Sequence, residues 1–90
     1  MPGSSKEEAA ETMALKALAY LATLPDDISR FLNISGIDAG ELRARAEEPE
    51  FLAAVMDFLM SDDRLLTGFG DAEGIDPREV SFARRALPGA

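Results

Sequence analysis

The sequence predicts a compact all-α protein, a bundle of five to six helices. Three observations support this prediction. Apolar residues recur three and four positions apart, helix-start signals repeat along the chain, and the stretch 49–60 is apolar on nearly every side. A helix without a polar face is typical of the centre of a fold, so we expect 49–60 to be surrounded by the other helices.

The length fits one small domain. Ninety residues bury about 60 to 65% of the surface of the unfolded chain. We expect a loose tail at 1–4, a single helical domain at 5–87 and a C-terminal tail at 88–90. The hydrophobic content of 47% is that of a globular protein, in spite of a net charge of −8.

Composition excludes several classes of chemistry. The chain has no cysteine and no histidine, which excludes disulfides and thiolate nucleophiles and fits a reducing compartment. The polar, acidic N-terminus is unlike a signal peptide, and no apolar run reaches the ~20 residues that span a membrane. We therefore expect a cytoplasmic protein without a membrane segment.

The acidity is uneven along the chain. Residues 1–45 carry five basic and seven acidic side chains, a balance of −2, whereas residues 46–90 carry four and ten, a balance of −6. Such a field repels nucleic acid and anionic lipid and favours a basic partner or solubility.

The first predicted helix begins at Ser5 and ends before Pro25. Ser5 and Glu8 have the spacing of a capping box, in which each side chain accepts the backbone amide of the other residue. Pro25 ends the helix because the residue before a proline is pushed out of the helical conformation. One face of this helix is apolar and rich in small residues: Ala10, Met13, Ala14, Ala17, Leu18, Leu21 and Leu24.

Two short helices are predicted next. One runs from about Asp26 to Asn33 and stops at Gly36. The other follows Asp38, which forms a capping box with Glu41. Both are shorter than the ~12 to 15 residues that an isolated helix needs, so they depend on packing against the long helices.

The central helix starts with Pro49 and ends near Ser61, where the next helix begins. That next helix contains Gly68 and Gly70. Each glycine costs about 1 kcal/mol relative to alanine inside a helix. We therefore expect the segment 68–74 to fray or to be irregular.

The last helix begins after Asp76, with Pro77 at its first position and Glu79 completing a capping box, and ends at Leu87. Its start repeats an earlier one: Gly36-Ile37-Asp38 with Glu41 and Leu42 corresponds to Gly74-Ile75-Asp76 with Glu79 and Val80. Two explanations stay open. Either two three-helix units form a pseudo-repeat, or unrelated helices use the same common capping chemistry.

A longer set of residues resembles a known family. It comprises Phe31-Leu32, Ser35-Gly36-Ile37, Leu42-Arg43, Phe51-Leu52, Ala54-Val55, Asp57-Phe58-Leu59, Asp62, Leu65-Leu66, Phe69, Pro77, Val80, Ala83-Arg84 and Leu87. In these residues, from about 18 to 87, the chain resembles the small bacterial family called Domain of Unknown Function 3572. The resemblance implies a soluble, all-helical, bacterial cytoplasmic protein and transfers no catalytic residue. Gly68 and Gly70 depart from the helix-forming residues expected there.

No catalytic residue, cofactor site or metal site is predicted. Paired carboxylates occur at 26–27, 47–50 and 62–63. Each set lies where a helix begins, and there the helix dipole stabilises negative charge by about 0.3 to 1 kcal/mol. The segment 71–76 resembles a calcium loop only in part, because its fifth and sixth positions are Ile75 and Asp76 instead of a ligand and a glycine.

We expect the protein to act by contact with another protein, as an adaptor, a regulatory partner or a homodimer, and not as an enzyme. Two very apolar helices exceed what one small domain can cover. Methionines adapt to irregular partners, so the methionines of the central helix are either core residues or part of a docking surface. The candidate surface contains Leu15, Tyr20, Met56 and Met60, with Glu50 and Asp57 as its acidic edge.

The alternative is a nucleic-acid-associated helical module. Two short helices in succession invite comparison with a helix-turn-helix motif, in which cations contact phosphates. The candidate residues are Arg43, Arg45, Arg78, Arg84 and Arg85. The net charge of −8 disfavours this function, and cations late in a helix also stabilise its negative end.

Overall fold

The computed structural model describes residues 4–89. These residues form α1 (Ser4–Ala22), α2 (Pro25–Ser35), the 3₁₀ turn η1 (Ala39–Glu41), α3 (Leu42–Arg45), α4 (Pro49–Met60), α5 (Asp63–Glu73) and α6 (Pro77–Arg85). The all-α prediction is confirmed. Of the predicted tail at 1–4, residues 1–3 lie outside the described residues and Ser4 begins α1, one residue earlier than predicted. The side chain of Ser5, with its predicted capping box, also lies outside the described residues.

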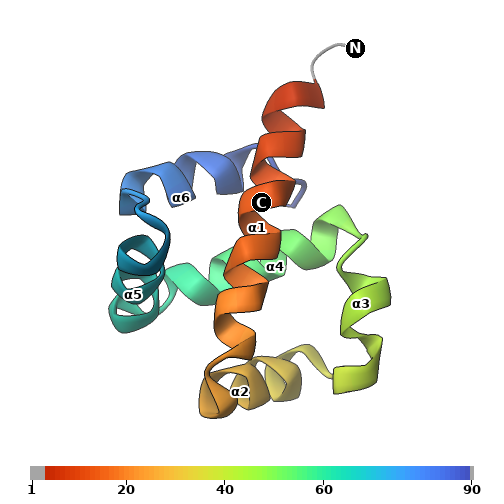
Figure 1. Cartoon of the computed structure of the whole chain (residues 1–90). Helices are drawn as coiled ribbons and strands as arrows, with labels where there is room; N and C mark the ends of the chain where they lie inside the picture. Colours follow the sequence, from red (N-terminus) through yellow and green to blue (C-terminus); the bar gives the residue numbers. More distant parts are fainter. Residues whose placement is uncertain (1–3, 90) are drawn as a thin grey trace.

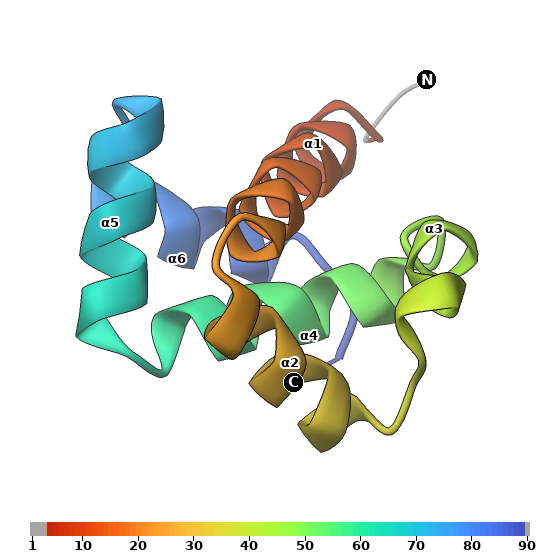
Figure 2. The same cartoon turned by 60° about the horizontal axis from the view of Figure 1, so that its bottom comes forward.

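The helices are arranged around α4, which α1 crosses (Figures 1 and 2). Helices α5 and α6 lie on one side of this crossing and α3 lies on the other, while α2 runs beneath it. Helix α1 packs against α4, α6 and α2, and α4 also packs against α5 and α6. None of the described helices is both long and apolar enough to cross a lipid bilayer.

The core is built on α4, as the absence of a polar face predicts. This helix buries Phe51, Leu52, Ala53, Val55, Met56, Phe58 and Leu59. Only Glu50, Ala54 and Asp57 are exposed on it. Helix α1 contributes the small buried residues Ala10, Ala14 and Ala17, which let its backbone come close to α4.

Aromatic pairs join α2 to α4 and α1 to α5. The ring of Phe31 on α2 lies between Phe51 and Phe58, with centroid distances of 5.6 and 5.2 Å. Tyr20 on α1 packs against Phe69 on α5, with a centroid distance of 5.8 Å. Tilted and edge-to-face pairs of this kind add about 0.5 to 1.5 kcal/mol to the burial of their area.

Local signals set the ends of α1 and α2. Leu24 precedes Pro25 and is extended, with φ −116°, so α1 ends at Ala22, two residues earlier than predicted. The hydroxyl of Thr23 donates to the carbonyl of Tyr20 at 2.6 Å and satisfies one of the last helical carbonyls. Helix α2 then runs to Ser35.

The two turns that the sequence repeats have the same local geometry. Gly36 and Gly74 both end a helix in the left-handed conformation, with φ 74° and 66°, which favours glycine. The Asp38 amide then donates to Glu41 at 2.8 Å, and the Asp76 amide donates to Glu79 at 3.0 Å. The helices that follow differ, since α3 has four residues and α6 has nine.

The predicted irregularity at 68–74 is wrong, because α5 is a continuous helix from Asp63 to Glu73. Both glycines allow close contacts. A Cβ at Gly68 would collide with the Tyr20 hydroxyl, and a Cβ at Gly70 would lie 2.6 Å from the backbone oxygen of Ile75. The contacts of these positions with α1 and with the following turn offset the low helix propensity of glycine.

Candidate functional site

The residues predicted as an interaction surface do not form one surface. Met56 is fully buried, so the prediction that it belongs to a docking surface is wrong. It lies on α4, and α1, α5 and α6 all pack against this helix. Met60 ends the same helix and is half-buried, with the Ser81 hydroxyl 3.7 Å from its sulfur.

Leu15 and Tyr20 lie on different sides of α1. Five positions in a helix correspond to about 140° of rotation. Tyr20 is half-buried with its ring turned to α5, whereas Leu15 is 45% exposed. These two residues therefore cannot contact the same partner helix.

The predicted acidic edge is exposed but partly neutralised. Glu50 and Asp57 are both exposed on α4. Asp57 accepts two hydrogen bonds from Arg84, at 2.7 Å from Nε and 3.2 Å from Nη2. The Arg84 side chain is only 12% exposed, and its Nη1 faces the carbonyl oxygens of Leu87, Pro88 and Gly89. Arg84 thus ties the end of α6 to α4.

The other arginines predicted for phosphate contact are scattered. Arg45 pairs with Glu48 at 2.8 Å, and Arg78 pairs with Asp76 at 3.0 Å. Arg43 is exposed on α3, whereas Arg85 lies on α6, and these helices occupy opposite sides of the fold (Figures 1 and 2). The structure does not bring the five arginines into one basic surface.

Asp27 is at the centre of an ion cluster that joins α2 to α5. It accepts hydrogen bonds from Arg64 at 2.7 Å and from Arg30 at 3.1 Å, and both arginines also lie near Asp62, at 3.5 and 3.6 Å. The Arg64 and Arg30 guanidiniums hold the pKa of Asp27 below its usual value. Asp27 lies in the first turn of α2 and Asp62 caps α5 by accepting the Arg64 amide, as predicted for carboxylates at helix starts.

Replacing Asp27 with asparagine should change how stability depends on pH. Its pKa is lower in the folded protein than the ~3.9 of an unfolded chain, so its ion pairs stabilise the fold fully above about pH 4. This contribution disappears as the pH falls through the lowered pKa. We expect Asp27→Asn to lower stability at pH 7 and to flatten the acid side of the curve of unfolding free energy against pH.

Urea unfolding between pH 2 and 7 measures this effect. Asp26→Asn is the matched control, since Asp26 is exposed and makes no ion pair within residues 4–89. If the unfolding free energy of the two variants falls equally steeply with decreasing pH, the ion cluster around Asp27 does not stabilise the fold.

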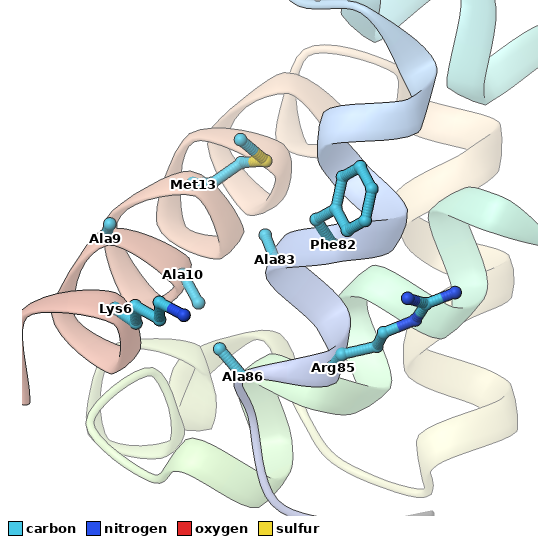
Figure 3. Close-up of a pocket in the computed structure, with 8 residues that line it drawn as sticks. All are labelled: Lys6, Ala9, Ala10, Met13, Phe82, Ala83, Arg85 and Ala86. Atoms are coloured by element: carbon cyan, nitrogen blue, oxygen red, sulfur yellow. The ribbon is translucent and has the colours of Figure 1, made fainter. Parts of the chain in front are cut away.

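A groove lies between α1 and α6 and is called here the α1–α6 groove (Figure 3). It has a volume of about 560 Å³. Its lining residues are Lys6, Ala9, Ala10 and Met13 from α1 and Phe82, Ala83, Arg85 and Ala86 from α6. In the close-up, Ala83 and Ala86 project from α6 towards α1.

The α1–α6 groove has an apolar floor and an exposed aromatic rim. Ala10 is buried, and Met13, Ala83 and Ala86 are half-buried. Phe82 is 65% exposed, and the Arg85 guanidinium lies 5.4 Å from the centre of its ring. This arrangement leaves an apolar surface uncovered where the two helices diverge.

Phe82 was not predicted as a site residue, although its position on the predicted last helix gives a signal. Val80 is fully buried on the inner face of α6, and Phe82 is two positions away, at about 200° around the helix. A single exposed phenylalanine is common on protein surfaces, and Phe82 becomes a binding candidate because it lines the apolar groove.

A smaller groove lies between α2 and α4. Its volume is about 380 Å³, and its lining residues are Phe31, Ile34, Ser35, Ala54, Asp57, Phe58 and Ser61. Ile34 is 69% exposed at its edge. Among residues 4–89, no group of three or more carboxylates is placed to hold a metal ion.

Comparisons with known proteins give a family and no function. No curated protein and no solved structure matches the chain. The profile of one family matches residues 7–90, nearly the whole chain. The chain therefore belongs to the family described as protein of unknown function, DUF3572.

Proposed function

We propose that this protein is a protein-interaction module without catalytic activity and that the α1–α6 groove is its docking site. The observation that carries the proposal is Phe82, which is 65% exposed beside an apolar hollow of about 560 Å³. Large exposed apolar groups around a hollow are characteristic of binding surfaces, because they lose contact with water when a partner covers them.

The rigidity of the groove supports this role. Ala10 is buried in its floor against the bundle, and Val80 and Leu87 anchor α6 in the core. The capping box of Asp76 and Glu79 fixes the start of α6. A site on two anchored helices loses little conformational entropy on binding, which favours affinity.

The ionisable groups support a role without catalysis. The pKa of Asp27 is lowered by Arg64, and the pKa of Asp76 is lowered by Arg78. A general acid or base needs a pKa near the working pH, and these shifts move both carboxylates away from it. The chain also has no histidine and no cysteine. In this proposal the protein acts in the bacterial cytoplasm, where proteins without disulfides are common.

Replacing Phe82 with aspartate should remove partner binding and preserve the fold. The side chain is mostly exposed, so we expect the unfolding free energy to change by less than about 0.5 kcal/mol. A charged group in place of the ring should lower recovery of the partner at least about tenfold, a typical effect for an aromatic anchor. The measurement is purification of the tagged protein from its own cells after nuclease treatment, followed by quantitative mass spectrometry.

Ile34→Asp is the matched control. Ile34 is 69% exposed, at the edge of the α2–α4 groove. A partner lost with Phe82→Asp and kept with Ile34→Asp supports the proposed site. The reverse pattern would place the site at the α2–α4 groove, and a partner lost on nuclease treatment would favour the nucleic-acid alternative.

A further inference from the structure

We propose that the partner segment bound in the α1–α6 groove is an amphipathic helix with acidic flanks. This inference rests on the proposed function and names the chemistry of its partner. Three features support it: the positions of the unpaired cations, the charge pattern of α1 and the shape of the groove.

Most cations of this acidic chain are already paired. Five of its nine basic residues form ion pairs: Arg30, Arg45, Arg64, Arg78 and Arg84. Within residues 4–89, the four without a carboxylate partner are Lys6, Lys16, Arg43 and Arg85. Two of these, Lys6 and Arg85, line the α1–α6 groove. A carboxylate supplied by a partner would therefore find cations that are not already neutralised.

The charges of α1 are segregated around its axis. At about 100° per residue, Lys6 and Lys16 lie within about 60° of Met13, which lines the groove. The acidic residues Glu7, Glu8 and Glu11 lie about 120 to 160° from Met13. Lys6 therefore lines the groove and Lys16 lies on the same side of α1, whereas the glutamates lie on the other side.

Local charge decides the sign of the field at the groove. The net charge of −8 is spread over the whole molecule, and charges further than a Debye length of about 8 Å are screened at physiological salt. On α6 the acidic residue before Phe82 is Glu79, whose carboxylate accepts the Asp76 amide at 3.0 Å. This bond holds the carboxylate at the helix start, and Glu79 is not among the residues that line the groove. The charged residues that do line it are the cations Lys6 and Arg85.

The shape of the groove favours a helix as its occupant. From Lys6 to Met13 the α1 side extends about 10 Å, two helical turns. This length accommodates apolar side chains three and four positions apart on one face of a partner helix. Ala9 and Phe82 are exposed at the rim, so the groove is open, whereas a small ligand needs enclosure of about 70 to 90% of its surface.

The test uses a display library of 18-residue helices with leucine fixed along one face. The flanking positions vary among glutamate, lysine and glutamine. We expect the wild-type protein to enrich glutamate at the flanks and the selected peptide to shift the backbone NMR signals of Ala83 and Ala86. Arg85→Glu should weaken this peptide about fivefold, whereas Arg43→Glu should change its affinity less than about twofold.

Arg43 is the matched control because it is exposed, has no ion pair within residues 4–89 and gives the same change in net charge. The acidic-helix inference is overturned if the library enriches lysine at the flanking positions or yields no binder. It is also overturned if Arg85→Glu and Arg43→Glu change the affinity of the selected peptide equally. A concentration-dependent dimer lost with Phe82→Asp would overturn it too, since a second copy would then occupy the groove. The proposed function fails on a different result, a native partner that Phe82→Asp retains.

Discussion

Replacing Met56 with glutamate should strongly destabilise the protein at neutral pH. Met56 is fully buried on α4, and no basic side chain is buried in the described core to pair with a new carboxylate. A buried, unpaired charge destabilises by at least about 4 kcal/mol. A domain of this size has a total stability of about 5 to 13 kcal/mol, so a large part of it would be lost. Far-ultraviolet circular dichroism and urea unfolding measure the effect.

Met60→Glu is the control for this prediction. Met60 follows four positions later on the same side of α4 but is half-buried at the helix end, so its carboxylate can reach water. We expect a loss of less than about 1.5 kcal/mol. Lowering the pH towards 5 should restore part of the stability lost in Met56→Glu, because burial raises the pKa of a carboxyl group and its neutral form costs less. Equal stability of the two variants at pH 7 would show that this flank of α4 is not covered.

The helix boundaries could be predicted well where a few adjacent residues determine them. The Asp76 and Glu79 box, Pro49 at the start of α4 and the left-handed turn at Gly36 all depend on bonds within six residues. Such bonds form in the same way whatever packs around them, so the sequence contains all the information they need.

The positions that depend on other helices could not be predicted in the same way. Met56 and Met60 lie on the same side of α4, and only the packing of the neighbouring helices against α4 distinguishes the buried residue from the half-buried one. Asp27 follows the pattern of a helix-start carboxylate, but its partner Arg64 is 37 positions away. The pairing of distant helices decides both cases.

The candidate site was missed for the same reason. The two walls of the α1–α6 groove come from opposite ends of the chain. No local pattern relates Ala10 to Ala83 across that distance. The exposed position of Phe82 on α6 was visible in the helical spacing, but its meaning depends on the hollow beside it.

Replacing Gly70 with alanine should destabilise the protein by about 2 kcal/mol, although helix propensity alone predicts a gain of about 1 kcal/mol. Gly70 is buried inside α5, and a Cβ there would lie 2.6 Å from the backbone oxygen of Ile75. Ile75 belongs to the turn in which its amide donates to the Gly70 carbonyl at 2.9 Å. Relief of the collision requires this backbone to move and breaks the turn that positions α6. Urea unfolding gives the change in stability.

Gly40→Ala separates the collision from the general effect of alanine. Gly40 lies in η1, its φ is not positive, and a Cβ there meets nothing within 4 Å. Alanine should stabilise this site by about 0.4 to 1 kcal/mol, because it reduces the conformational entropy of the unfolded chain. Opposite signs for the two variants would show that close backbone contact sets the need for glycine in α5. A gain in stability for both variants would mean that the backbone of the α5–α6 turn can move away from the new Cβ at little cost. The position of α6 in the groove would then depend on the burial of Val80 and Leu87 instead.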